Sequence, residues 1–115
     1  MSGPAAIARG TRLCAIDEVE EGGARVVEVA PGPPVVEVIV VRRAGRFIVY
    51  HNHCPHMHAP LNMLATVFVA GDTLICDHHS ARFGIDDGLC TAGPCKGDSL
   101  TGIPIVVREG AVVVA

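Results

Sequence analysis

All six histidines of this chain lie in two short clusters, and each cluster contains one cysteine. The first cluster runs from His51 to His58 and includes Cys54, and the second is Cys76-Asp77-His78-His79. Two thiols and at least two imidazoles, paired as C-x-H and C-x-x-H, are ligands that suit an iron or zinc centre. We therefore expect the stretch from His51 to Phe83 to carry the function and the rest of the chain to be its scaffold.

The scaffold has the features of an all-β protein. Apolar residues make up 50% of the 115 residues but aromatic residues only 3%, so small β-branched side chains must fill the core. Short alternating or β-branched runs are separated by Gly and Pro turns, and no segment of ten or more residues has a helical period. An antiparallel β sandwich or small barrel is the expected fold. The expected strands are 11–16, 24–30, 35–42, 46–50, 73–76, 81–85, 104–108 and 111–114; residues 62–70 are ambiguous and 89–100 read as a loop.

Length and charge exclude several classes of protein. A chain of 115 residues is expected to form a single domain, residues 1–115, with its cluster-binding part at about 51–83. The net charge of −3 gives no basic stripe for nucleic acid. No apolar run is long enough to span a membrane, and the N-terminal residues do not have the pattern of a signal peptide. These features predict a soluble, cytoplasmic protein.

The cysteine count argues against a disulfide framework. Five cysteines is an odd number, and Cys54 and Cys76 belong to the metal-like clusters. Cys14 is expected to be a small core residue. Cys90 and Cys95 flank a Gly-Pro segment, and in a reducing cytoplasm we expect them to be thiols rather than a disulfide.

The spacing of the ligands bears on the choice between iron and zinc. A structural zinc site typically has C-x2-4-C with H-x3-5-H, whereas here each loop contributes one Cys and one His. This mixed pairing suits a two-iron cluster in which thiolates hold one iron and imidazoles hold the other. A zinc-stabilised site remains the alternative.

These residues resemble the Rieske-type [2Fe-2S] proteins, most closely the soluble Rieske ferredoxins. The C-x-H and C-x-x-H motifs and their spacing carry the resemblance, and it extends from Arg12 onward. The flanking residues agree with it: Pro55 and Met57 to Leu61, Ala81-Arg82-Phe83, Asp86-Asp87-Gly88, Gly93-Pro94, and Leu100-Thr101 before a Val-rich hairpin.

The resemblance implies the ligand set and the cofactor, one Rieske-type [2Fe-2S] cluster per chain. Cys54 and Cys76 would bind the inner iron, and His56 and His79 the outer iron. His58 and His78 are then extra, and a register that uses one of them is a minor alternative. His58 and Ser80 stand where the family usually has glycine, and neither is explained by the pattern.

The resemblance also indicates a low reduction potential. High-potential Rieske proteins have a disulfide between the two loops and hydroxyl groups of Ser and Tyr that donate hydrogen bonds to cluster sulfur. The corresponding positions here are Ala59 and His78, Ala81, and Phe83. Because hydrogen bonds to sulfur tune such clusters, we expect a potential on the order of −150 mV.

The function implied by the resemblance is one-electron transfer, without catalysis by the chain itself. Electrons would pass from an NAD(P)H-dependent flavoprotein reductase to a terminal, often ring-hydroxylating, oxygenase. The protein would act as a monomer and dock near His56 and His79, without contact to nucleic acid or membrane. The alternatives are a small subunit of an NAD(P)H nitrite reductase-like system, a zinc-stabilised binding module without redox function, and a fragment of an oxygenase α subunit.

Overall fold

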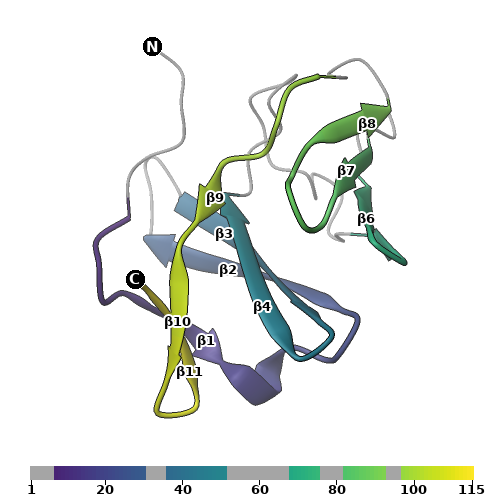
Figure 1. Ribbon diagram of the computed structural model, residues 1–115. Helices are drawn as coiled ribbons and strands as arrows, with labels where there is room; N and C mark the ends of the chain where they lie inside the picture. The colour runs from purple at the N-terminus through teal and green to yellow at the C-terminus, as the bar shows by residue number, and fades with distance from the viewer. Residues whose placement is uncertain (1–6, 31–35, 52–67, 76–81, 93–96) are drawn as a thin grey trace.

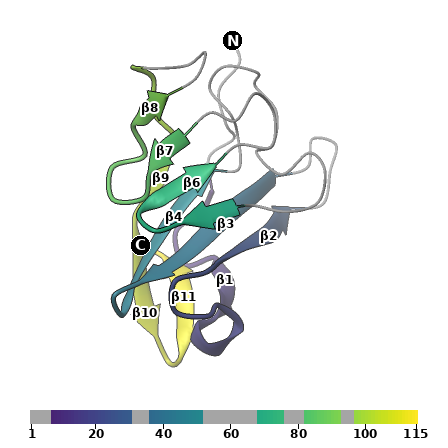
Figure 2. The same cartoon turned by 90° about the vertical axis from the view of Figure 1, so that its right-hand side faces the viewer.

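Three antiparallel sheets make up the part of the chain that the computed structural model describes, residues 7–30, 36–51, 68–75, 82–92 and 97–115 (Figures 1 and 2). The outer sheet has the order β1-β11-β10 (Arg12–Ala15, Ala111–Val114, Ile105–Arg108). The central sheet has the order β2-β3-β4-β9 (Ala24–Ala30, Val36–Arg43, Arg46–His51, Gly102–Ile103). The small sheet has the order β5-β6-β7-β8 (Phe68–Ala70, Thr73–Ile75, Arg82–Gly84, Cys90–Ala92). The all-β antiparallel fold is confirmed.

Strand β3 lies between two hydrophobic cores. Val38 and Val40 pack with residues of the outer sheet, whereas Ile39 and Val41 pack with residues of the small sheet. All four side chains are at most 1% exposed. Successive side chains of a strand point to opposite faces, so the unbroken apolar run of β3 is what a strand covered on both faces requires.

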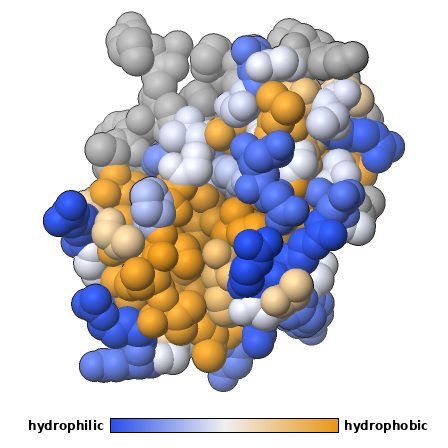
Figure 3. All heavy atoms as spheres, viewed as in Figure 1, coloured by the Kyte–Doolittle hydropathy of each residue, from blue (hydrophilic) through white to orange (hydrophobic). Residues whose placement is uncertain are grey.

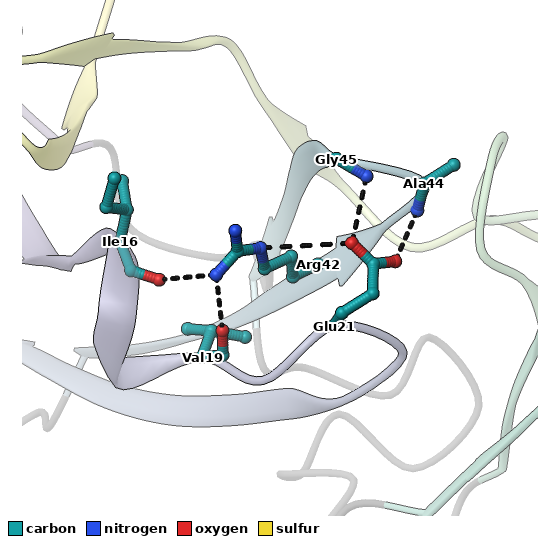
Figure 4. Close-up of polar contacts among 6 residues, drawn as sticks. All are labelled: Ile16, Val19, Glu21, Arg42, Ala44 and Gly45. Atoms are coloured by element: carbon teal, nitrogen blue, oxygen red, sulfur yellow. Dashed lines mark hydrogen bonds and ion pairs between the residues drawn. The ribbon is translucent and has the colours of Figure 1, made fainter.

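Arg42, at the end of β3, holds the connection between β1 and β2 against the central sheet (Figure 4). Its Nη1 donates hydrogen bonds to the carbonyl oxygens of Ile16 and Val19, both at 3.2 Å. Its guanidinium also lies over the ring of Phe47, 5.2 Å from the ring centroid. One side chain therefore satisfies two carbonyl groups of a segment that includes the 3-10 turn η1 (Ile16–Glu18).

Glu21 stabilises the turn between β3 and β4 (Figure 4). Its carboxylate accepts hydrogen bonds from the backbone N–H groups of Ala44, at 2.5 Å, and Gly45, at 3.0 Å. The hydrogen bond from Gly45 is the main reason that the pKa of Glu21 lies below its ordinary value of 4.5. Ala44 has a φ of 53°, which is unusual for a residue with a side chain, and the carboxylate helps to hold that conformation.

The strands expected from the sequence at 24–30, 35–42 and 46–50 correspond closely to β2, β3 and β4. The expectation of a loop from Leu89 to Leu100 was wrong at β8, which pairs with β7, and at a bridge between Leu89 and Ser99. A strand of three residues is too short to show alternation; pairing with β7 and burial of Cys90 in the core between the small and central sheets hold it extended. Cys14 is buried in the core, as expected, and burial raises the pKa of its thiol.

Strand β10 is one of the two edge strands of the outer sheet within the described residues. Val106 and Val107 on this strand are exposed, and Figure 3 shows a broad apolar area on the face that carries β10. Within the described ranges, none of the helical segments has the length and apolar character needed to cross a membrane.

Candidate metal centre

The strand ends that border the two Cys/His loops lie in one row that crosses the small sheet at one end of its strands. Phe68 of β5 pairs with Ile75 of β6, Ile75 pairs with Arg82 of β7, and Arg82 pairs with Ala92 of β8. Residues 52–67 enter the sheet at Phe68, and residues 76–81 leave it at Ile75 and return at Arg82. The register therefore brings one end of the first loop and both ends of the second loop to the same end of the small sheet.

The other end of the first loop is the end of β4. The backbone N–H of His51, the last residue of β4, donates a hydrogen bond of 2.9 Å to the carbonyl oxygen of Thr101. On the opposite side, His51 is in register with Val38 of β3. His51 is itself buried, so the point at which the chain leaves the central sheet is fixed from both sides.

A buried cluster joins the central sheet to the small sheet. Leu74, Phe83 and Ile85 pack against Ile39 and Val41 of β3. Phe83 is completely buried, and it has no hydroxyl group. This position therefore offers no hydroxyl donor, and the low reduction potential expected from the sequence stays a prediction.

Tyr50 adds a directional contact to this cluster. Its hydroxyl donates a hydrogen bond of 2.6 Å to the carbonyl oxygen of Ile85, and its side chain is only 4% exposed. The ring lies directly against Gly88, where a Cβ atom would be 2.8 Å from Cε1 of Tyr50. Burial, together with the nearby Asp87 and Asp86 carboxylates, raises the pKa of Tyr50 to about 12.

The site residues predicted from the sequence, Cys54, His56, Cys76 and His79, lie outside the described residues, as do Ala59, Ala81 and the extra histidines His58 and His78. Their donor chemistry still tests whether a cluster fits. Each loop contains one cysteine and two or more histidines, and one end of the first loop and both ends of the second lie at the same end of the small sheet. Two thiolates for one iron and two imidazoles for the other is the donor set of a Rieske [2Fe-2S] centre, so the residues fit this cofactor.

Sequence reasoning did not find Tyr50 or Gly88. The available signals were a single tyrosine at the end of a strand and a glycine in an Asp-Asp-Gly turn, and both are also common in positions without function. The contact between them is a long-range one that only the packing of the two sheets reveals.

One end of the first Cys/His loop and both ends of the second lie at the same end of a small antiparallel sheet, an arrangement that suits the class of small iron-sulfur electron carriers. Residues 10–108 match the Rieske [2Fe-2S] domain. Because this match covers most of the chain, the protein belongs to the Rieske [2Fe-2S] family. The cofactor of the family is a Rieske-type [2Fe-2S] cluster, and the chain is an electron carrier rather than a catalyst.

Two relatives of known function are ferredoxin components of oxygenase systems. The chain is 26% identical to the 3-phenylpropionate/cinnamic acid dioxygenase ferredoxin subunit of Photorhabdus laumondii, over 89% of this chain and 90% of the relative. It is 28% identical to the ferredoxin component of the alkene monooxygenase system of Xanthobacter autotrophicus, over 89% of this chain and 77% of the relative.

Solved structures have the same fold. The ferredoxin of carbazole 1,9a-dioxygenase from Nocardioides aromaticivorans superposes with a TM-score of 0.74 at 28% identity, covering 94% of this chain and 98% of that one. A chain in a complex of reduced oxygenase and oxidised ferredoxin of carbazole 1,9a-dioxygenase gives a TM-score of 0.72 at 25% identity, covering 90% of each chain.

Proposed function

We propose that the protein is the ferredoxin component of an oxygenase system, with Cys54, His56, Cys76 and His79 as the ligands of its cluster. It accepts one electron from an NAD(P)H-dependent flavoprotein reductase and passes it to a terminal oxygenase, often one that hydroxylates aromatic rings. The chain acts as a single-domain monomer in the cytoplasm, with residues 51–83 as its cluster-binding part.

The alignment of Phe68, Ile75 and Arg82 in one row is the observation that supports this proposal most strongly. It places ends of both ligand loops at the same end of the small sheet. Cys76 directly follows Ile75 in the sequence. The bound cluster supplies one-electron chemistry. The chain supplies two thiolates and two imidazoles. Pairing of β6 with β7 also holds the two ends of the second loop together.

The proposed partners are supported by the relatives. Both relatives are ferredoxin components of oxygenase systems, and one solved neighbour is a ferredoxin in complex with its oxygenase. We place the docking surface near His56 and His79, because the outer iron is the natural exit for the electron. Weak electron-transfer encounters use small interfaces, so a contact limited to the loop tips is sufficient.

Cluster content and electron paramagnetic resonance test the ligand assignment. The purified protein is expected to be red-brown and to contain two irons per chain, with the low average g value of an imidazole-ligated cluster after reduction by dithionite. His79→Ala should lose this spectrum, whereas the matched control His78→Ala should retain it. A colourless protein with one zinc per chain contradicts the electron-carrier function. Loss of the spectrum in the His78 variant alone shows that the ligand register is wrong.

A further inference from the structure

Tyr50 connects the two parts of the chain that lead to the two ligand loops. It lies in β4, one residue before the end of that strand and four residues before Cys54. Its hydrogen-bond acceptor, the carbonyl oxygen of Ile85, lies just after β7, the strand that follows the second loop. The bond therefore joins the strand that enters the first loop to the strand that leaves the second.

The other buried contacts between these two sheets are of a different kind. Ile39, Val41, Leu74 and Phe83 meet through apolar surfaces, and such contacts are non-directional. A hydrogen bond of 2.6 Å to a carbonyl group fixes both distance and direction. Apolar packing holds the small sheet on the central sheet, but it allows small displacements that this hydrogen bond resists.

The surrounding residues confine the ring of Tyr50, in addition to the hydrogen bond that fixes its hydroxyl group. Gly88 and Gly102 both approach the ring, and a Cβ atom on Gly88 would come within 2.8 Å of it. Leu100, which donates its backbone N–H to the carbonyl oxygen of Gly88 at 2.9 Å, holds that glycine in place. The Tyr50 side chain is thus enclosed by the small sheet's turn on one side and by its own sheet on the other.

We propose that Tyr50 is a positioning residue that fixes the two ligand loops relative to each other. This inference rests on the proposed function, because each loop must contribute one ligand to each iron. If the loops shift relative to each other, the Fe–S and Fe–N geometry changes, since the thiolates and imidazoles come from both of them. Through its hydrogen bond to Ile85, Tyr50 acts on the two strands that lead to the loops and is not itself one of the proposed ligands.

The test compares Tyr50→Phe with Ile39→Val in the cluster-loaded protein. The first change removes the hydroxyl and keeps the ring, and the second removes one methylene from the same buried cluster and leaves the hydrogen bond in place. Three quantities are measured at a temperature where circular dichroism shows both variants folded. These are the rate of iron loss to a chelator, the line shape of the reduced cluster in electron paramagnetic resonance, and its midpoint potential.

Tyr50→Phe is expected to lose iron about three to ten times faster than the wild type, the factor that one net hydrogen bond supplies. Its resonance lines should broaden and its midpoint potential should shift. Ile39→Val should change line shape and potential less than Tyr50→Phe does, because the hydrogen bond that opposes a shift of the small sheet is still present. Equal iron loss and equal spectra in the two variants would refute the positioning role. A wild-type protein without a Rieske-type spectrum would instead refute the proposed function, so the two failures are distinguishable.

Discussion

Gly88→Ala is expected to destabilise the protein through two separate effects. Gly88 has a φ of 71°, and placing a side chain in the left-handed region costs about 1–2 kcal/mol. The new Cβ would also lie 2.8 Å from Cε1 and 3.2 Å from Cζ of Tyr50, and 3.4 Å from Cβ of Leu100. The ring cannot move away freely, because its hydroxyl is bonded to Ile85. Overpacking of this kind typically costs about 1–3 kcal/mol, so the total is about 2–5 kcal/mol.

Gly110→Ala is the matched control for the backbone effect. Gly110 has a φ of 74° in the turn between β10 and β11, and no atom lies within 4 Å of its added Cβ. It should therefore show the cost of the backbone conformation alone, about 1–2 kcal/mol.

The measurement is urea denaturation of the cluster-loaded proteins, followed by far-ultraviolet circular dichroism at one pH. The difference between the two variants isolates the contact with Tyr50 and should be about 1–3 kcal/mol. Combining Gly88→Ala with Tyr50→Leu should reduce this difference, because the clashing ring is gone. If the two glycine variants lose equal free energy of unfolding, the ring relaxes without cost and the reasoning about its confinement is wrong.

Two further predictions concern Arg42 and the hydroxyl group of Tyr50. Arg42→Met should lower the free energy of unfolding by about 2 kcal/mol, because two backbone carbonyl groups lose a charged donor. Its control is Arg25→Met, which removes the exposed ion pair with Glu18 at 3.8 Å. In the same urea experiment this variant should change the free energy of unfolding by less than about 0.5 kcal/mol. The pKa of Tyr50 is raised to about 12 in the folded protein, compared with about 10 in the unfolded chain. The stability that the neutral hydroxyl contributes is therefore complete below pH of about 10 and is lost as the pH rises toward 12. The free energy of unfolding should fall by roughly 3 kcal/mol over this range. Tyr50 is the one tyrosine of the chain, so the ultraviolet absorbance of tyrosinate follows this titration directly, and a midpoint near 10 in the folded protein would contradict its burial.

The sequence was sufficient to predict three strands of the central sheet, β2, β3 and β4, but not the short β9. Residues 24–30 alternate, a Pro-rich segment ends them, and 35–42 is the most β-branched run of the chain. These are local signals, and β2 and β3 lie at or within one residue of the expected positions. The same local reasoning failed for β8, because its three residues are held by pairing with β7 and by burial of Cys90, neither of which a local pattern records.

The same distinction between local and long-range signals applies to the candidate metal centre. The four ligands were predicted from spacing and from a family resemblance, which depend on chemistry that is local to each loop. The row formed by Phe68, Ile75 and Arg82 could not be predicted, because it depends on the register of β5 with β6 and on the pairing of β6 with β7, which the second loop separates in the sequence. Residues 62–70 were ambiguous for this reason: β5 is only three residues long, and its pairing with β6 defines it.

Strand β3 explains how a scaffold without ligands can still influence the metal centre. Its even-numbered residues, Val38 and Val40, pack toward the outer sheet, and its odd-numbered residues, Ile39 and Val41, pack toward the small sheet that borders the ligand loops. A protein interior is close-packed, so a change of volume on one face of this strand shifts the strand and therefore its other face. The hydrogen bond of Tyr50, on the neighbouring strand β4, opposes such a shift because it fixes the distance between the central sheet and Ile85. Packing of β3 thus supports the small sheet, and we expect the hydrogen bond of Tyr50, one residue before the end of β4, to restrict the remaining movement.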